Sequence, residues 1–142
     1  MSGDTSGRPL LIEVPAGELI DKITILEIKG ARIADPEKLR HVRAELTALA
    51  AVRDGALPPS ADLAGLTAQL KAVNEALWQV EDDLRDCERR QDFGPCFVEL
   101  ARSVYRHNDR RAALKRAVNE LLGSRLVEEK SYAPYGADVR PS

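Results

Sequence analysis

The sequence lacks most of the features that identify membrane, secreted or metal-binding proteins. Its 142 residues include two cysteines, Cys87 and Cys96, and neither a CxxC motif nor a Cys/His spacing typical of zinc. No apolar run approaches the roughly 20 residues that cross a bilayer. The start, MSGDTSGRP, has no basic or apolar region of a signal peptide. We therefore expect a cytoplasmic protein with no membrane segment, metal or cofactor.

Aromatic residues are scarce and charge is nearly balanced. Aromatics make up 4% of the chain, and the formal net charge is −2. A chain without excess positive charge is not expected to bind nucleic acid, because that binding depends on cationic side chains that neutralise phosphates. What the chain has in abundance is Ala, Leu, Glu and Arg, which favour helices. The composition predicts a single all-α domain.

Apolar spacing and capping residues divide the chain into four helices. Asp35 followed by Pro36 indicates a helix start, as does Ser60, and Gly55 and Gly123 indicate helix ends. The turn near residues 91–94 makes the last two helices a long antiparallel hairpin. The predicted helices run over about 17–33, 36–53, 61–90 and 95–122.

The expected fold is a four-helix bundle with a small two-stranded β-ribbon joining the termini. Residues 9–15, PLLIEVP, and residues 124–132, SRLVEEKSY, have the apolar content of short strands that can pair. The predicted domain therefore spans 9–132, after a disordered N-terminus over 1–8 and before a loose tail over 133–142.

A polar seam along the last helix is the best functional lead. On a helical wheel, one face of residues 103–122 carries apolar Val104 and Val118. The same face also carries four polar side chains, which are Asn108, Arg111, Lys115 and Asn119. A buried charge is costly unless it is paired or faces water. The seam must therefore meet acidic partners or line a wet cavity.

The preceding helix also carries polar and charged side chains on or beside its apolar face. Glu81 shares a face with Leu77 and Leu84, and Asn74 and Arg85 flank that stripe. Counting outward from the turn of the hairpin places these side chains level with the seam. We predict one polar layer, to which Glu27 is added from the first helix and whose other members are Asn74, Glu81, Tyr105, Asn108 and Arg111.

Two interpretations of this layer stay open. In the first, Glu81 and Glu27 neutralise Arg111 and Lys115 in a closed network that fixes the register of the helices. In the second, the cations and amides line a pocket that holds an anionic ligand, and a carboxylate or Tyr105 transfers a proton. The ligand-binding candidates are Glu27, Asn74, Glu81, Arg85, Tyr105, Asn108, Arg111, Lys115 and Asn119, and no catalytic residue is assigned.

The first helix carries two further patterns. Glu18 and Asp21 fall away from its core stripe, so we expect them on a solvated face. Ile25 and Ile28 give the helix a second apolar side. Such a helix is either central in the fold or lies at an interface, and we predict self-association through Ile25 and Ile28.

Four ordered blocks, covering about residues 10–135, resemble a bacterial family of uncharacterised proteins known as domain of unknown function 6165. They are GELIDKITILEIK, LKAVNEALWQVEDDLRDCE, FVELARSVYRHNDRRAALKRAVN and LVEEKSY. The resemblance implies a setting of cell-surface polysaccharide synthesis. The chain departs from the family at Pro15-Ala16, where Ser-Pro is expected before Gly17-Glu18, so the usual serine cap is missing.

These observations lead to two expectations of function. The first is that the chain binds, and can turn over, a small anionic metabolite such as a sugar phosphate or nucleotide sugar in the polar seam. The alternative is a non-enzymatic adaptor that binds a partner protein through the first helix or the C-terminal segment.

Overall fold

The fold consists of four α-helices in a computed structural model, which describes residues 7–124. They are α1 (Ala16–Arg32), α2 (Pro36–Ala56), α3 (Ala61–Arg89) and α4 (Pro95–Leu122). The all-α class and the four predicted helices are confirmed; the bounds of the last helix agree at both ends, and those of the others differ by at most three residues. Gly55 does not end α2, because the helix continues to Ala56 and its cap is Leu57.

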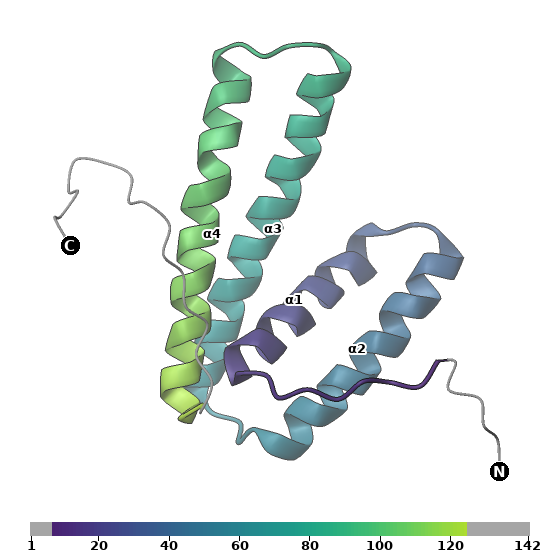
Figure 1. The fold of residues 1–142 in the computed structure, drawn as a ribbon, viewed down its shortest axis with the longest axis vertical. Helices are drawn as coiled ribbons and strands as arrows, with labels where there is room; N and C mark the ends of the chain where they lie inside the picture. Colours follow the sequence, from purple (N-terminus) through teal and green to yellow (C-terminus); the bar gives the residue numbers. More distant parts are fainter. Residues whose placement is uncertain (1–6, 125–142) are drawn as a thin grey trace, which may run out of the picture.

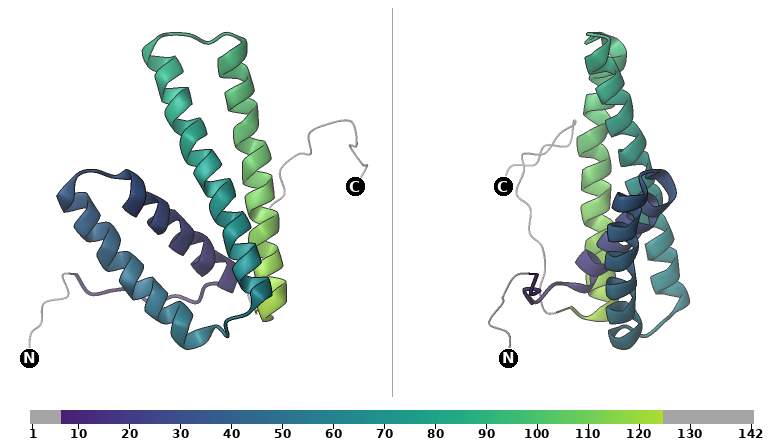
Figure 2. Two further views of the ribbon diagram at one scale, coloured as in Figure 1. Left: turned by 180° about the vertical axis from the view of Figure 1, so that it is seen from behind. Right: turned by 90° about the vertical axis from the view of Figure 1, so that its right-hand side faces the viewer.

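The helices form two antiparallel hairpins that diverge like the arms of a V (Figure 1). The α3–α4 hairpin is the longer arm, as predicted, and α1 lies between it and α2. In the left view of Figure 2, α2 lies on the far side of α1 from the long hairpin. Among the described residues α2 contacts no helix but α1, whereas α1 contacts all three others. Of the two placements expected for the first helix, central in the fold or at an interface, its contacts show the central one.

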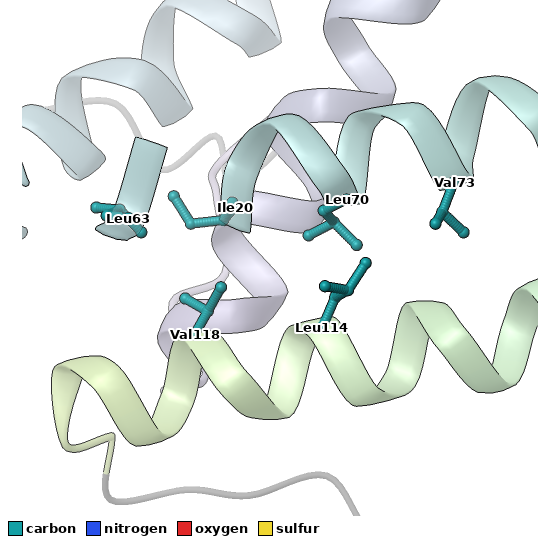
Figure 3. Close-up of a cluster of buried hydrophobic side chains, with 6 residues drawn as sticks. All are labelled: Ile20, Leu63, Leu70, Val73, Leu114 and Val118. Atoms are coloured by element: carbon teal, nitrogen blue, oxygen red, sulfur yellow. The ribbon is translucent and has the colours of Figure 1, made fainter. Parts of the chain in front are cut away.

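The core lies where α1 enters the base of the long hairpin. Ile20 of α1 projects between α3, which contributes Leu70, and α4, which contributes Leu114 and Val118 (Figure 3). Ile20, Leu70 and Val118 are at most 1% exposed. Further along the hairpin Leu77, Leu84 and Val104, which the helical wheel places in the core, are only half-buried.

The predicted β-ribbon is not part of the described structure. Residues 9–15 contain no strand, and the side chains of Leu10, Leu11 and Ile12 are 92%, 92% and 81% exposed. A strand needs a hydrogen-bonded neighbouring strand, and residues 7–124 contain no strand that could pair with 9–15. The predicted partner, 124–132, lies outside the described residues except for Ser124, as do nearly all of 1–8 and the whole of 133–142. No helix within residues 7–124 is long and apolar enough to span a bilayer.

Candidate functional site

The start of α1 is held by side chains from the end of α4. The cap position is Pro15, which offers no side-chain hydrogen bond. Instead the Gly17 amide donates to Asn119 Oδ1 at 2.7 Å, and the Ala16 amide donates to Ser124 Oγ at 3.0 Å. These bonds satisfy two of the amides that a helix start leaves unpaired. The missing serine cap is therefore replaced from another helix.

Gly17 is required by the closeness of α1 to α4. A Cβ atom at this position would lie 2.2 Å from the Lys115 carbonyl oxygen and 2.9 Å from Asn119 Oδ1. Neither neighbour has room to give way, because one belongs to the backbone and the other accepts a hydrogen bond from Gly17 itself. This close approach fixes the position along α4 at which α1 packs against the long hairpin.

One turn further along α1, Asp21 is the centre of a buried polar network. Arg111 Nε donates to Asp21 Oδ1 at 2.9 Å, and Arg111 Nη2 donates to Asp21 Oδ2 at 2.6 Å. Asn74 Nδ2 donates to Asp21 Oδ1 at 2.9 Å and to Thr24 Oγ1 at 3.0 Å. Asp21 is 1% exposed. We call Asp21, Thr24, Asn74 and Arg111 the Asp21 network; it joins α1, α3 and α4.

A second ion pair lies beside the Asp21 network. Lys115 Nζ lies 2.8 Å from Glu18 Oε2, and the lysine side chain is 11% exposed. Every fully buried side-chain nitrogen and oxygen within residues 7–124 has a hydrogen-bond partner. Arg111 and Lys115 thus each pair with an acid of α1. This agrees with the closed-network interpretation, but the acids are Asp21 and Glu18 rather than Glu81 and Glu27.

The predicted polar layer is assembled only in part. Asn74 and Arg111 meet as expected, but Glu81 is exposed and forms no hydrogen bond or ion pair among the described residues. Glu27 lies 3.6 Å from Lys71 and not near the seam cations. Asn108 has no hydrogen bond to the network within residues 7–124.

Tyr105 also lies outside the network. Its side chain is 39% exposed, and it interacts with Arg102, whose pKa it raises. The helical wheel is right about the helix faces here. It cannot show which positions a neighbouring helix covers, and Glu81 and Tyr105 are exposed.

Asp21 is the residue that the sequence interpretation placed wrongly on a solvated face, whereas the Glu18 side chain is 44% exposed and pairs with Lys115 from there. The available signal was the second apolar side of the first helix, because Asp21 lies four residues before Ile25 and seven before Ile28. Such spacing puts all three on one face. If that face is buried, Asp21 is buried with it and needs a cation.

An open groove lies next to the Asp21 network, between α1 and α3. Its volume is about 380 Å³. We call it the α1–α3 groove; its lining consists of Ile25, Ile28, Asn74, Leu77, Trp78, Glu81, Asp82, Arg85 and Arg111. The α1 isoleucines with Leu77 and Trp78 give it an apolar surface, and the charged side chains of α3 supply most of its polar groups. Four predicted site residues therefore line this groove, namely Asn74, Glu81, Arg85 and Arg111.

Some charged side chains that line the α1–α3 groove are paired with another side chain of the protein, and others are not. Arg111 forms a two-bond pair with Asp21. Arg85, by contrast, has no ion pair or hydrogen bond among the described residues, and the same is true of Glu81 and Asp82. Arg85 is thus the cation of the groove whose charge no other described side chain compensates.

The second apolar side of α1 faces α3 across the α1–α3 groove. Ile28 is 2% exposed and Ile25 is half-buried, and both side chains line the groove. Self-association through these two residues stays a prediction.

Other titratable groups lie at the tip of the long hairpin. Burial raises the pKa of the Cys87 thiol, and hydrogen bonds from Arg89 and Arg90 lower the pKa of Asp86. Cys87 is buried and Cys96 is exposed, and both are free thiols. Within residues 7–124, no group of three or more His, Cys, Asp or Glu side chains is arranged to hold a metal ion.

Comparisons with family models, with curated proteins and with solved structures find no match for this chain. The family resemblance and the setting that it implies therefore stay predictions.

Proposed function

We propose that the chain binds a small anionic metabolite, such as a sugar phosphate or nucleotide sugar, in the α1–α3 groove. The observation that carries this proposal is Arg85, a guanidinium that lines the groove and has no partner among the described residues. A planar guanidinium with several unsatisfied donors is well suited to a phosphate or carboxylate. The anion-binding residue of this proposal is therefore Arg85.

The Asp21 network has a different role in this proposal. Arg111 and Lys115 were the expected anion-binding cations, but each is already paired with an acid of α1. A ligand anion would have to displace these acids, one of which is buried. The network instead holds α1 at a fixed angle to α3, and that angle determines the shape of the groove.

The size and lining of the groove support a small ligand. Small-molecule sites have volumes of roughly 300–1,000 Å³ and are mostly apolar, with a few polar groups that orient the ligand. The groove, at about 380 Å³, is near the lower end of that range. Trp78 offers a flat apolar surface for a ring, as aromatic side chains commonly do. The sugar-related setting implied by the family resemblance fits such a ligand.

Thermal unfolding in the presence of ligands tests the proposal. We expect at least one member of a panel of nucleotide sugars, sugar phosphates and aromatic acids to stabilise the wild type. A ligand at 100 times its Kd stabilises by about 2.7 kcal/mol, which at this chain length shifts Tm by several degrees. Arg85→Met should unfold like the wild type and lose this shift.

The matched control is Arg43→Met. Arg43 is an exposed arginine of α2 that does not line the groove and has no ion pair among the described residues. It should keep the full ligand shift. A panel without any stabilising member, or a shift that survives in Arg85→Met, contradicts the proposal.

One observation favours an adaptor as a second candidate. The consecutive side chains Leu10, Leu11 and Ile12 are more than four-fifths exposed, and exposed apolar patches mark interaction sites. On this alternative the partner binds the exposed segment before α1. The triple change of these residues to Ser should then abolish capture of the partner without changing Tm, whereas Arg85→Met should leave capture intact.

A further inference from the structure

The α1–α3 groove has an excess of negative charge, which restricts the ligands that it can hold. Asp21 neutralises Arg111. The remaining charged groups of the lining are the carboxylates of Glu81 and Asp82 and the guanidinium of Arg85. A simple anion attracted to Arg85 is therefore repelled by two acids close by. The ligand must therefore also carry a group that interacts favourably with the carboxylates of Glu81 and Asp82.

The three charged residues and Trp78 lie on one face of α3. Their positions, 78, 81, 82 and 85, follow the spacing of a single helical face. Glu81 and Arg85 are one turn apart, about 6 Å along the helix axis. This spacing permits an ion pair within the helix, yet Arg85 pairs with neither acid among the described residues. Both signs of charge are thus presented to the groove separately.

An amine satisfies the acidic end of this face in two ways. It forms charge-assisted hydrogen bonds with the carboxylates of Glu81 and Asp82. It is also attracted to the face of an aromatic ring, and Trp78 lies on the turn before these acids. A hydroxyl group can form these hydrogen bonds, but it is neutral and leaves the negative charge of the two carboxylates uncompensated.

We propose that the ligand of the α1–α3 groove is zwitterionic, with an amine held by Glu81, Asp82 and Trp78 and an acidic group held by Arg85. This inference rests on the proposed function and adds the chemical class of the ligand. The amine and the acidic group are separated by about one helical turn. Aminated sugar phosphates have this chemistry, and simple sugar phosphates lack the amine.

Three probes that share one ring test the inference. They are glucosamine 6-phosphate, glucose 6-phosphate and glucosamine, each titrated against the full chain while the fluorescence of Trp78, the sole tryptophan, is recorded. We expect glucosamine 6-phosphate to bind about three- to tenfold more tightly than either of the others. That factor is what one or two partly exposed charge contacts contribute. The advantage should shrink as salt is raised.

Variants assign the preference to the acids. In the double variant Glu81→Gln, Asp82→Asn, glucosamine 6-phosphate and glucose 6-phosphate should bind equally well. The control is Asp83→Asn, since Asp83 is the next acid of α3, accepts a hydrogen bond from Gln79 and does not line the groove. It should keep the wild-type preference. The variants lie at the surface of α3, and circular dichroism checks that they are folded.

The outcomes separate this inference from the proposed function. If glucose 6-phosphate binds the wild type as tightly as glucosamine 6-phosphate, and Arg85→Met weakens both, the zwitterionic ligand is refuted and the anion site stands. A preference for the amine that survives in the double variant also refutes the inference. If none of the three probes binds and the panel also fails to stabilise the wild type, both proposals are refuted.

Discussion

Replacing Arg111 by Met should destabilise the fold strongly, because it leaves Asp21 buried without its cation. Asp21 is 1% exposed and receives two of its hydrogen bonds from Arg111. Removing one member of a buried ion pair costs about 3–5 kcal/mol. The Arg111 side chain is 30% exposed, so water can reach its place in the variant. We therefore expect the lower end, about 3 kcal/mol.

This loss should be visible in a thermal melt. At this chain length a change of 1 kcal/mol moves Tm by about 3 °C, so Arg111→Met should melt about 10 °C below the wild type. Arg110→Met is the matched control: Arg110 is the preceding residue of α4, is exposed and makes one long hydrogen bond of 3.5 Å, to Gln69. It should melt within about 2 °C of the wild type.

A result of the opposite sign would refute the reasoning. If Arg111→Met is as stable as the wild type or more stable, Asp21 is not the buried partner that the structure shows. The seam cations would then be held for a ligand, which is the pocket interpretation of the sequence. Urea unfolding of both variants supplies the free energies of unfolding directly.

Three further predictions concern packing and backbone conformation. Gly17→Ala should lower the free energy of unfolding by about 1–3 kcal/mol, because its methyl group meets the Lys115 carbonyl; a urea midpoint equal to that of the wild type would contradict this. Leu70→Ala should cost about 2–5 kcal/mol and Leu77→Ala clearly less, because Leu70 is 0% exposed and Leu77 lines the groove; equal losses in urea unfolding would count against this difference. Gln91→Gly should stabilise by about 0.5–1 kcal/mol in thermal melts, because Gln91 has a φ of 53° that glycine adopts without strain; a lower Tm would show that this backbone conformation is not strained.

The secondary structure was predictable because its signals are local. Asp35 accepts a hydrogen bond from the Lys38 amide and Ser60 accepts one from the Leu63 amide, as capping chemistry predicts. Gly123 ends α4 with a φ of 64°. Gly55 gave the wrong helix end because a glycine within a helix costs only about 1 kcal/mol, which neighbouring contacts can offset. The strand at 9–15 was wrong because strand formation depends on a partner rather than on composition.

The site was less predictable because it depends on how helices are placed relative to one another. The cations Arg111 and Lys115 were identified correctly as groups that need acidic partners. Their acids were assigned wrongly, to Glu81 of α3 and to Glu27 of α1 rather than to Asp21 and Glu18 of α1, since the sequence gives the face of a residue but not the angle between helices. Trp78 was missed for the same reason. Trp78 lines the α1–α3 groove, which exists only because α1 leaves part of α3 uncovered. No local sequence pattern predicts this arrangement.

The most direct test of the central claim is a fluorescence titration of the single tryptophan, Trp78, with glucose 6-phosphate. We expect a saturable change in the emission of the wild type and an unchanged titration in Arg43→Met. Binding to Arg85→Met should be at least about fivefold weaker, because a charge-assisted contact is lost. No saturable change in the wild type, or equal affinities in the wild type and Arg85→Met, would contradict the claim that the α1–α3 groove binds an anion through Arg85.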